Sequence, residues 1–200
     1  MRVRTTLILL LLSLVMVACT IGPEREKAPS VHLLEWQGEL DPAGEALASG
    51  LQIAGPKAYP GHGSARMAYR QSGRELRYFA NNRWVASPAD LIGAALTEAM
   101  ADSGLFSDVA APGSAIRMPY RLDVDVIRLE QHFDDDGSHV RLTLRYRLVD
   151  AGNGRSLGHL RQDLRQDAGS GDPAGGVVAA NEALAESIRA LVATLPEWLD

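Results

Sequence analysis

Two alternating stretches in the second half of the sequence restrict the fold more than any other feature. Within Tyr120–Leu129 and His139–Val149, apolar and polar residues alternate with a period of two, as in strands that bury one face. Between them, Asp134–Gly137 supplies residue types that favour a tight turn. The two stretches are therefore expected to pair as an antiparallel hairpin.

The charges on this hairpin support one register. If the turn closes there, Asp123 lies opposite Arg147 and Asp125 lies opposite Arg145. Each such cross-strand pair contributes roughly 0.2–1 kcal/mol. We interpret the charged face as solvated and the other face as core, which would hold Leu122, Val124, Val126, Val140, Leu142, Leu144, Tyr146 and Leu148.

Two amphipathic helices are predicted, one on each side of the hairpin in the sequence. Ser87 and Asp172 are suitable N-cap residues, and each precedes a proline at the first helical position. The first helix is expected to end before Gly104 and the second at Pro196. Their apolar stripes contain Leu91, Ile92, Ala95, Leu96, Ala99 and Met100 in the first, and Val177, Leu184, Ile188, Leu191 and Leu195 in the second.

Shorter patterns complete the expected domain. Apolar runs and turn residues predict strands at Val31–Trp36 and Leu51–Ala54, a hairpin of Ala65–Arg70 with Glu75–Ala80, and a third meander strand at Arg155–Gln166. The inward face of the third strand stays open, because Leu157 differs in parity from Leu160 and Leu164. The order of elements predicts one α+β domain over residues 31–200, a mostly antiparallel sheet with two amphipathic helices on one face.

The first residues have the pattern of an export signal. Arg2 and Arg4 precede the apolar run Leu7–Val17, which is shorter than the roughly 20 residues that a spanning helix needs. The segment Met16–Cys19 resembles a bacterial lipobox, in which the cysteine is acylated after cleavage. We therefore predict a signal peptide over residues 1–18, a lipid anchor such as palmitate on Cys19, and a flexible tether up to residue 30.

Composition and charge narrow the class of protein. A hydrophobic content of 46% and a charged content of 22% are typical of a globular chain, and the formal net charge of −5 disfavours nucleic acid as a partner. The single cysteine excludes an internal disulfide and a zinc ribbon. By resemblance to Gram-negative sorting signals, Thr20 after the cysteine favours the periplasmic face of the outer membrane.

No catalytic or cofactor motif stands out. The sequence lacks a P-loop, a dinucleotide fingerprint and a nucleophile elbow, and the pair His62 and Ser64 has no supporting acid. His132, Asp134–Asp136 and His139 crowd one turn, but they lack the pattern of a calcium loop, so an exposed polar turn is favoured over a metal site. We expect neither a cofactor nor a metal.

One aromatic cluster offers a site for a partner. Tyr78, Arg83 and Trp84 lie together before the first helix, and these residue types dominate interface hot spots. Core packing is the favoured alternative for Trp84, because a tryptophan beside a helix start commonly packs on that helix. All three are kept as candidates for a partner interface.

The order of these features resembles a known family. After the lipobox come Arg66–Arg70, a Leu76-x-Tyr78 strand, Trp84 and a proline-opened helix, then Tyr120–Val124, a strand meander and a helix that ends with Trp198-Leu199. This is similar to the ABC-type transport auxiliary lipoproteins, which include the PqiC-like proteins. The resemblance runs from Val31 to Leu199, and its most specific part is Arg66–Leu96.

The resemblance implies a function as well as a fold. Members accompany MCE-type ABC systems that move lipids between the inner and outer membranes, so the implied partners are an MCE-domain protein with its permease and ATPase. The implied role is docking or assembly without catalysis, and homo-oligomerisation is left open. The alternatives are a lipoprotein regulator of a periplasmic enzyme, such as a peptidoglycan synthase activator, and a small periplasmic hydrolase.

Overall fold

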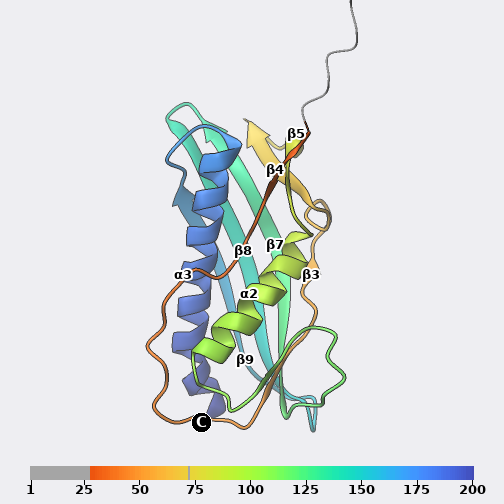
Figure 1. Ribbon diagram of the computed structural model, residues 1–200, viewed down its shortest axis with the longest axis vertical. Helices are drawn as coiled ribbons and strands as arrows, with labels where there is room; N and C mark the ends of the chain where they lie inside the picture. Colours follow the sequence, from red (N-terminus) through yellow and green to blue (C-terminus); the bar gives the residue numbers. More distant parts are fainter. Residues whose placement is uncertain (1–27, 72) are drawn as a thin grey trace, which may run out of the picture.

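The predicted hairpin forms the centre of the sheet in the computed structural model, which describes residues 28–71 and 73–200 (Figure 1). Strand β7 (Tyr120–Asp134) pairs antiparallel with β8 (Gly137–Asp150), and β8 pairs antiparallel with β9 (Ser156–Asp167). Strands β7 and β8 are longer than the sequence pattern indicated, and β9 is shifted by one residue from its predicted bounds. Together they supply a wide surface with one apolar and one charged face.

The predicted register of the hairpin is confirmed. Asp123 lies opposite Arg147, and Asp125 lies opposite Arg145. The apolar residues of both strands then point to the opposite face, where they are buried. Only the second of these pairs forms an ion pair, because Arg121 of the same strand holds Asp123.

A β-bulge changes the alternation of side chains halfway along β7. The pairing with β8 shifts between Val126 and Arg128, so Ile127 is the additional residue. Val126 and Leu129 are both buried on the core side, although their numbers differ in parity. The bulge keeps the apolar residues in the core and moves Glu130 to the charged face.

The second edge of β7 carries three short parallel strands in succession. These are β2 (Leu51–Ile53), β3 (Lys57–Ala58) and β4 (Arg66–Gln71). The sheet is continued by β5 (Arg77–Trp84) antiparallel to β4, β1 (Ser30–His32) parallel to β5, and β6 (Val109–Ala110) parallel to β2. The sheet is therefore mixed: its longest ladders are antiparallel, and its short ladders beside β7 are parallel.

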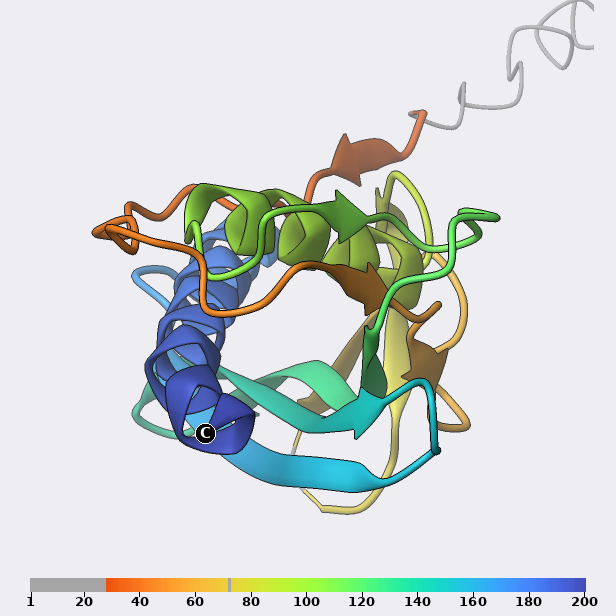
Figure 2. The same cartoon turned by 90° about the horizontal axis from the view of Figure 1, so that it is seen from below.

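Two helices cover the apolar face, as predicted (Figure 2). Helix α2 (Pro88–Asp102) and helix α3 (Pro173–Leu199) begin at the predicted caps. The backbone N–H of Asp90 donates to the Ser87 hydroxyl, and the N–H of Gly175 donates to the Asp172 carboxylate at 2.9 Å. These bonds satisfy N–H groups that lack a partner within the helix.

The core lies between the helices and the sheet. Leu96 of α2 and Ile188 of α3 are both fully buried, which confirms their predicted place. Leu34 and Trp36 also enter this core, but as part of a loop, because the first strand ends at His32. The Trp36 indole N–H donates to Asp102 at 3.2 Å and ties this loop to the end of α2.

The end of α3 differs from the prediction. The helix continues through Pro196 to Leu199, since only one further turn follows the proline and few hydrogen bonds are lost. Trp198 in this turn packs on the backbone of Gly158. A second bulge at Leu157 aligns Gly158 with Leu148, which resolves the ambiguous parity of β9.

Candidate functional site

A buried carboxylate organises the charged face of the sheet near the end of β7. The side chain of Glu130 is 1% exposed, and its Oε1 accepts hydrogen bonds from Arg70 Nε at 2.8 Å and His132 Nε2 at 2.9 Å. Arg128 Nε lies 3.4 Å from the same oxygen. Strand β4 and the bulged half of β7 thus bring several cationic or imidazole groups to one acid.

The Glu130 carboxylate remains ionised despite its burial. Burial alone raises its pKa, but the hydrogen bonds and charges of Arg70 and His132 outweigh that effect and hold the pKa below its usual value. Glu130 Oε2 has no hydrogen-bond partner among the described residues. The carboxylate is therefore fixed by one oxygen only.

His62 covers the other side of this acid. Its Nε2 lies 4.0 Å from Glu130 Oε2, and its Nδ1 has no partner among the described residues. Burial lowers the pKa of His62 more than the charge of Glu130 raises it, so the imidazole is neutral at pH 7. The loop that carries His62 is held by the Tyr78 hydroxyl, which donates to the Gly61 carbonyl at 2.9 Å.

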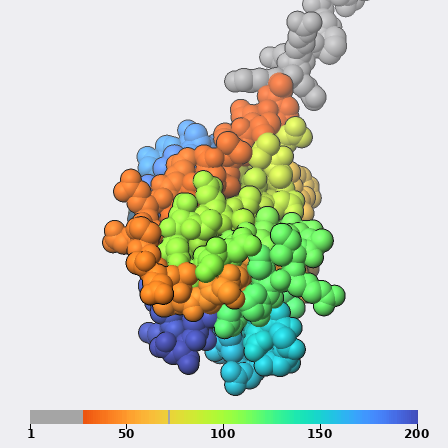
Figure 3. Space-filling model, turned by 60° about the horizontal axis from the view of Figure 1, so that its bottom comes forward, coloured from red at the N-terminus to blue at the C-terminus, as the bar shows by residue number. Residues whose placement is uncertain are grey.

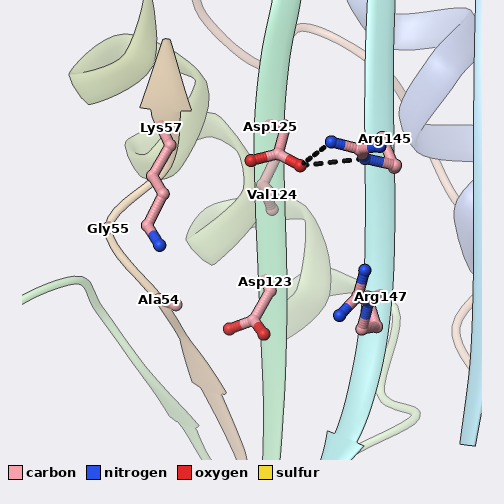
Figure 4. A pocket seen from close by; sticks show the side chains of 8 residues that line it. All are labelled: Ala54, Gly55, Lys57, Asp123, Val124, Asp125, Arg145 and Arg147. Carbon is pink, nitrogen blue, oxygen red and sulfur yellow. Dashed lines mark hydrogen bonds and ion pairs between the residues drawn. The ribbon is translucent and has the colours of Figure 1, made fainter. Parts of the chain in front are cut away.

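A polar pocket of about 150 Å³ lies farther along the same face (Figure 4). Arg145 donates two hydrogen bonds to Asp125, at 2.7 and 2.9 Å, and a third to the Tyr59 hydroxyl. Asp123 accepts from Arg121 at 2.7 Å. The pocket is lined by Ala54, Gly55, Lys57, Asp123, Val124, Asp125, Arg145 and Arg147.

Two cations in this pocket are left uncompensated. The side chains of Lys57 and Arg147 point into it from β3 and β8 (Figure 4), and neither makes an ion pair or a side-chain hydrogen bond with a described residue. Asp123 and Asp125 are each held by another arginine. The pocket therefore favours an anionic group, such as a carboxylate or phosphate on a partner.

The turn with two histidines is held together by its own contacts. His132 binds Glu130, His139 Nδ1 lies 3.2 Å from Asp134, and the two imidazole rings stack with centroids 5.0 Å apart. Within residues 28–71 and 73–200, no three His, Cys, Asp or Glu side chains are grouped so that they could hold a metal ion.

The three sequence candidates for a partner interface occupy different environments. Trp84 is 4% exposed and packs in the core, which is the alternative that sequence reasoning favoured for it. Tyr78 is half-buried, with the Arg66 guanidinium 3.8 Å from its ring centroid. Arg83 alone is exposed.

The predicted signal peptide, Cys19 and most of the tether lie outside the described residues. Within the described ranges, no helix combines the length and the apolarity that crossing a bilayer requires. Sequence reasoning did not single out Glu130 as a buried acid. The change of parity between Val126 and Leu129 was the one available signal for the bulge that places it on the charged face.

The fold of this chain is similar to those of solved protein structures. It is similar to a protein of Xanthomonas campestris assigned to DUF330, with a TM-score of 0.75, 23% identity, and coverage of 84% of this chain and 96% of that chain. A hypothetical protein of Chlamydia trachomatis gives a TM-score of 0.53 and 9% identity, over 76% of this chain and 98% of that chain. At these identities the likeness concerns the fold alone, and no curated protein matches the chain.

A family model shows the family to which the chain belongs. The model of the ABC-type transport auxiliary lipoprotein component matches residues 48–192. This range includes strands β2 to β9, the whole of α2 and all of α3 except its last turns. The chain therefore belongs to the family of ABC-type transport auxiliary lipoproteins, as its sequence features indicated.

Proposed function

We propose that this protein is a lipid-anchored periplasmic accessory subunit that docks to an MCE-type ABC system for lipid transport between the two membranes. The observation that carries this proposal is the family match over residues 48–192. The lipobox-like Met16–Cys19 supports anchoring, and Thr20 supports the outer membrane as the location. The implied partners are an MCE-domain protein and its permease and ATPase.

The site geometry favours docking over catalysis. Glu130 is bound by Arg70 and His132, so this acid stabilises the fold around it. His62 approaches an acid already held by other groups, and its neighbour Ser64 accepts a hydrogen bond from the Arg66 backbone. These contacts support a protein that acts by binding.

The charged face of the sheet around β3, β7 and β8 is the surface that we assign to docking. It presents Lys57 and Arg147 without internal partners beside the neutralised Asp123 and Asp125. Charges arranged in this way steer a partner of complementary charge and fix its orientation. An anchor on Cys19 would confine the domain to a layer beside the membrane and raise its effective concentration near a membrane-bound complex.

Affinity capture from bacterial membranes tests the proposal. Wild-type protein should recover an MCE-domain protein, and both Cys19→Ser and the double variant Lys57→Glu/Arg147→Glu should recover less of it. Arg189→Glu, a charge reversal on the exposed side of α3, is the matched control and should behave like wild type. Recovery of a cell-wall synthase without any MCE-domain protein would instead support a regulator of a periplasmic enzyme.

A further inference from the structure

Exposed aliphatic side chains gather where the described chain begins. Val31 and Leu33 flank the last residue of β1, Val85 follows β5, and Val178 lies near the start of α3. Each is between 49% and 57% exposed. Single exposed aliphatic residues are common on protein surfaces, but a contiguous group marks a contact site.

Backbone contacts bring these residues together. Val31 lies opposite Arg83 in the parallel β1–β5 ladder, and the N–H of Val85 donates to the His32 carbonyl at 2.8 Å, which places Val85 beside Leu33. Asn181 of α3 donates to the Leu33 carbonyl at 3.2 Å. Leu33 and Val178 line one groove. We name Val31, Leu33, Arg83, Val85 and Val178 the entry patch.

The entry patch lies close to the predicted lipid anchor. Residues 20–27 separate Cys19 from the described chain, and eight residues span at most about 30 Å when extended. The described chain starts at the patch end of the domain and runs from there across the surface (Figures 1 and 3). A lipid on Cys19 would therefore hold the patch within about 30 Å of the bilayer.

We propose that the entry patch rests on the lipid surface that holds the acyl chains of Cys19, an inference that depends on the proposed lipid anchor. Aliphatic side chains gain by entering the boundary between headgroups and acyl chains, and an arginine among them can bind lipid phosphate. The patch has this composition, with four aliphatic residues around Arg83. The contact would orient the domain as well as add to its anchoring.

The opposite end of the domain would then point away from the membrane. Gln131 near the end of β7 donates to the Asp172 carbonyl just before α3, so the start of α3 lies at that end of the strand. Ile116 precedes β7 and is 59% exposed, which makes it an exposed aliphatic residue at the far end. The length of β7 separates the two ends by roughly 40 Å.

The chain offers a clean labelling experiment. Cys19 is the only cysteine, and acylation consumes its thiol, so an introduced cysteine is the single reactive thiol of the mature lipoprotein. Acylated Val178→Cys and Ile116→Cys variants carry a polarity-sensitive fluorophore and are reconstituted in vesicles of phosphatidylethanolamine and phosphatidylglycerol with brominated lipid. We expect the fluorophore at position 178 to be quenched at least twofold more than the one at position 116.

A second comparison tests the chemistry of the patch. Leu33→Ser with Arg83→Ala should remove most of the quenching at position 178, whereas Leu47→Ser, at another exposed leucine, should leave it unchanged. Equal, weak quenching at positions 178 and 116 in protein that floats with the vesicles would overturn the inference while leaving the anchor intact. Protection of position 178 only after a partner protein is added would also overturn it. Protein that does not float with the vesicles would refute the anchor itself.

Discussion

Replacement of the buried acid by its neutral isostere should destabilise the domain measurably. In Glu130→Gln the side chain keeps its size but loses the charge that binds Arg70 at 2.8 Å and His132 at 2.9 Å. A hydrogen bond to a charged group contributes about 1.5–3 kcal/mol, and a neutral one about 0.5–1.5 kcal/mol. Two weakened bonds therefore suggest a loss of roughly 2–3 kcal/mol.

The exposure of the partners keeps this loss from being larger. The side chains of Arg70 and Arg128 are 26% and 33% exposed, so water can solvate both guanidinium groups after the acid is neutralised. For a domain of this size, each kcal/mol lowers Tm by about 2–4 °C. We expect Glu130→Gln to lower Tm by roughly 5–10 °C at pH 7.

Thermal unfolding followed by circular dichroism measures this change. Glu75→Gln is the matched control, because Glu75 makes an exposed pair with Arg77 at 2.7 Å and its removal should leave Tm unchanged. An unchanged or higher Tm for Glu130→Gln would mean that the desolvation of this acid outweighs its bonds. The interpretation of Glu130 as the organising group of the charged face would then be wrong.

Three further outcomes are expected. Burial lowers the pKa of His62, and burial together with the charge of Arg165 lowers the pKa of His139. The unfolded chain therefore binds more protons than the folded chain as the pH falls. The free energy of unfolding should therefore fall as pH drops through about 6.5, and His62→Asn should flatten this slope in urea titrations between pH 7.5 and 5. Glu130, whose pKa is also lowered, adds a second loss below its ordinary value of 4.5. In Gly158→Ala the added methyl group would overlap the Trp198 ring, so the variant should change the tryptophan emission and lower the free energy of unfolding. The same substitution in a Trp198→Ala background should lower the free energy of unfolding only slightly. Leu96→Ala and Ile188→Ala should each cost about 2–5 kcal/mol in urea titrations, and an unchanged midpoint in either variant would refute the two-helix packing.

Local patterns predicted the parts of the fold that local chemistry determines. The placement of Asp123 and Asp125 opposite arginines predicted the correct register, and the caps at Ser87 and Asp172 predicted both helix starts. The three short strands beside β7 were harder to predict from the sequence. Leu51–Ile53 pairs with residues almost seventy positions later, and parallel neighbours so far apart leave no turn signal in the sequence.

The candidate site was harder to predict for the same reason. His62, Arg70 and Glu130 come from a loop and two strands that only the tertiary fold brings together. The alternation of β7, read without its bulge at Ile127, would place Glu130 on the apolar face and so does not predict its contacts with Arg70 and His132 on the charged face. Trp84 shows the converse case, since a residue type common in interfaces serves the core here.

Lipid movement between the two membranes in living cells tests the central claim most directly. In bacteria that lack this gene, transfer of pulse-labelled phospholipid between inner and outer membranes is measured after complementation with wild type, Cys19→Ser or Arg189→Glu. We expect wild type and Arg189→Glu to restore transfer, and Cys19→Ser to remain close to the uncomplemented strain. Equal transfer rates with and without the gene, under conditions in which loss of the MCE-domain protein slows transfer, would contradict a role in lipid transport.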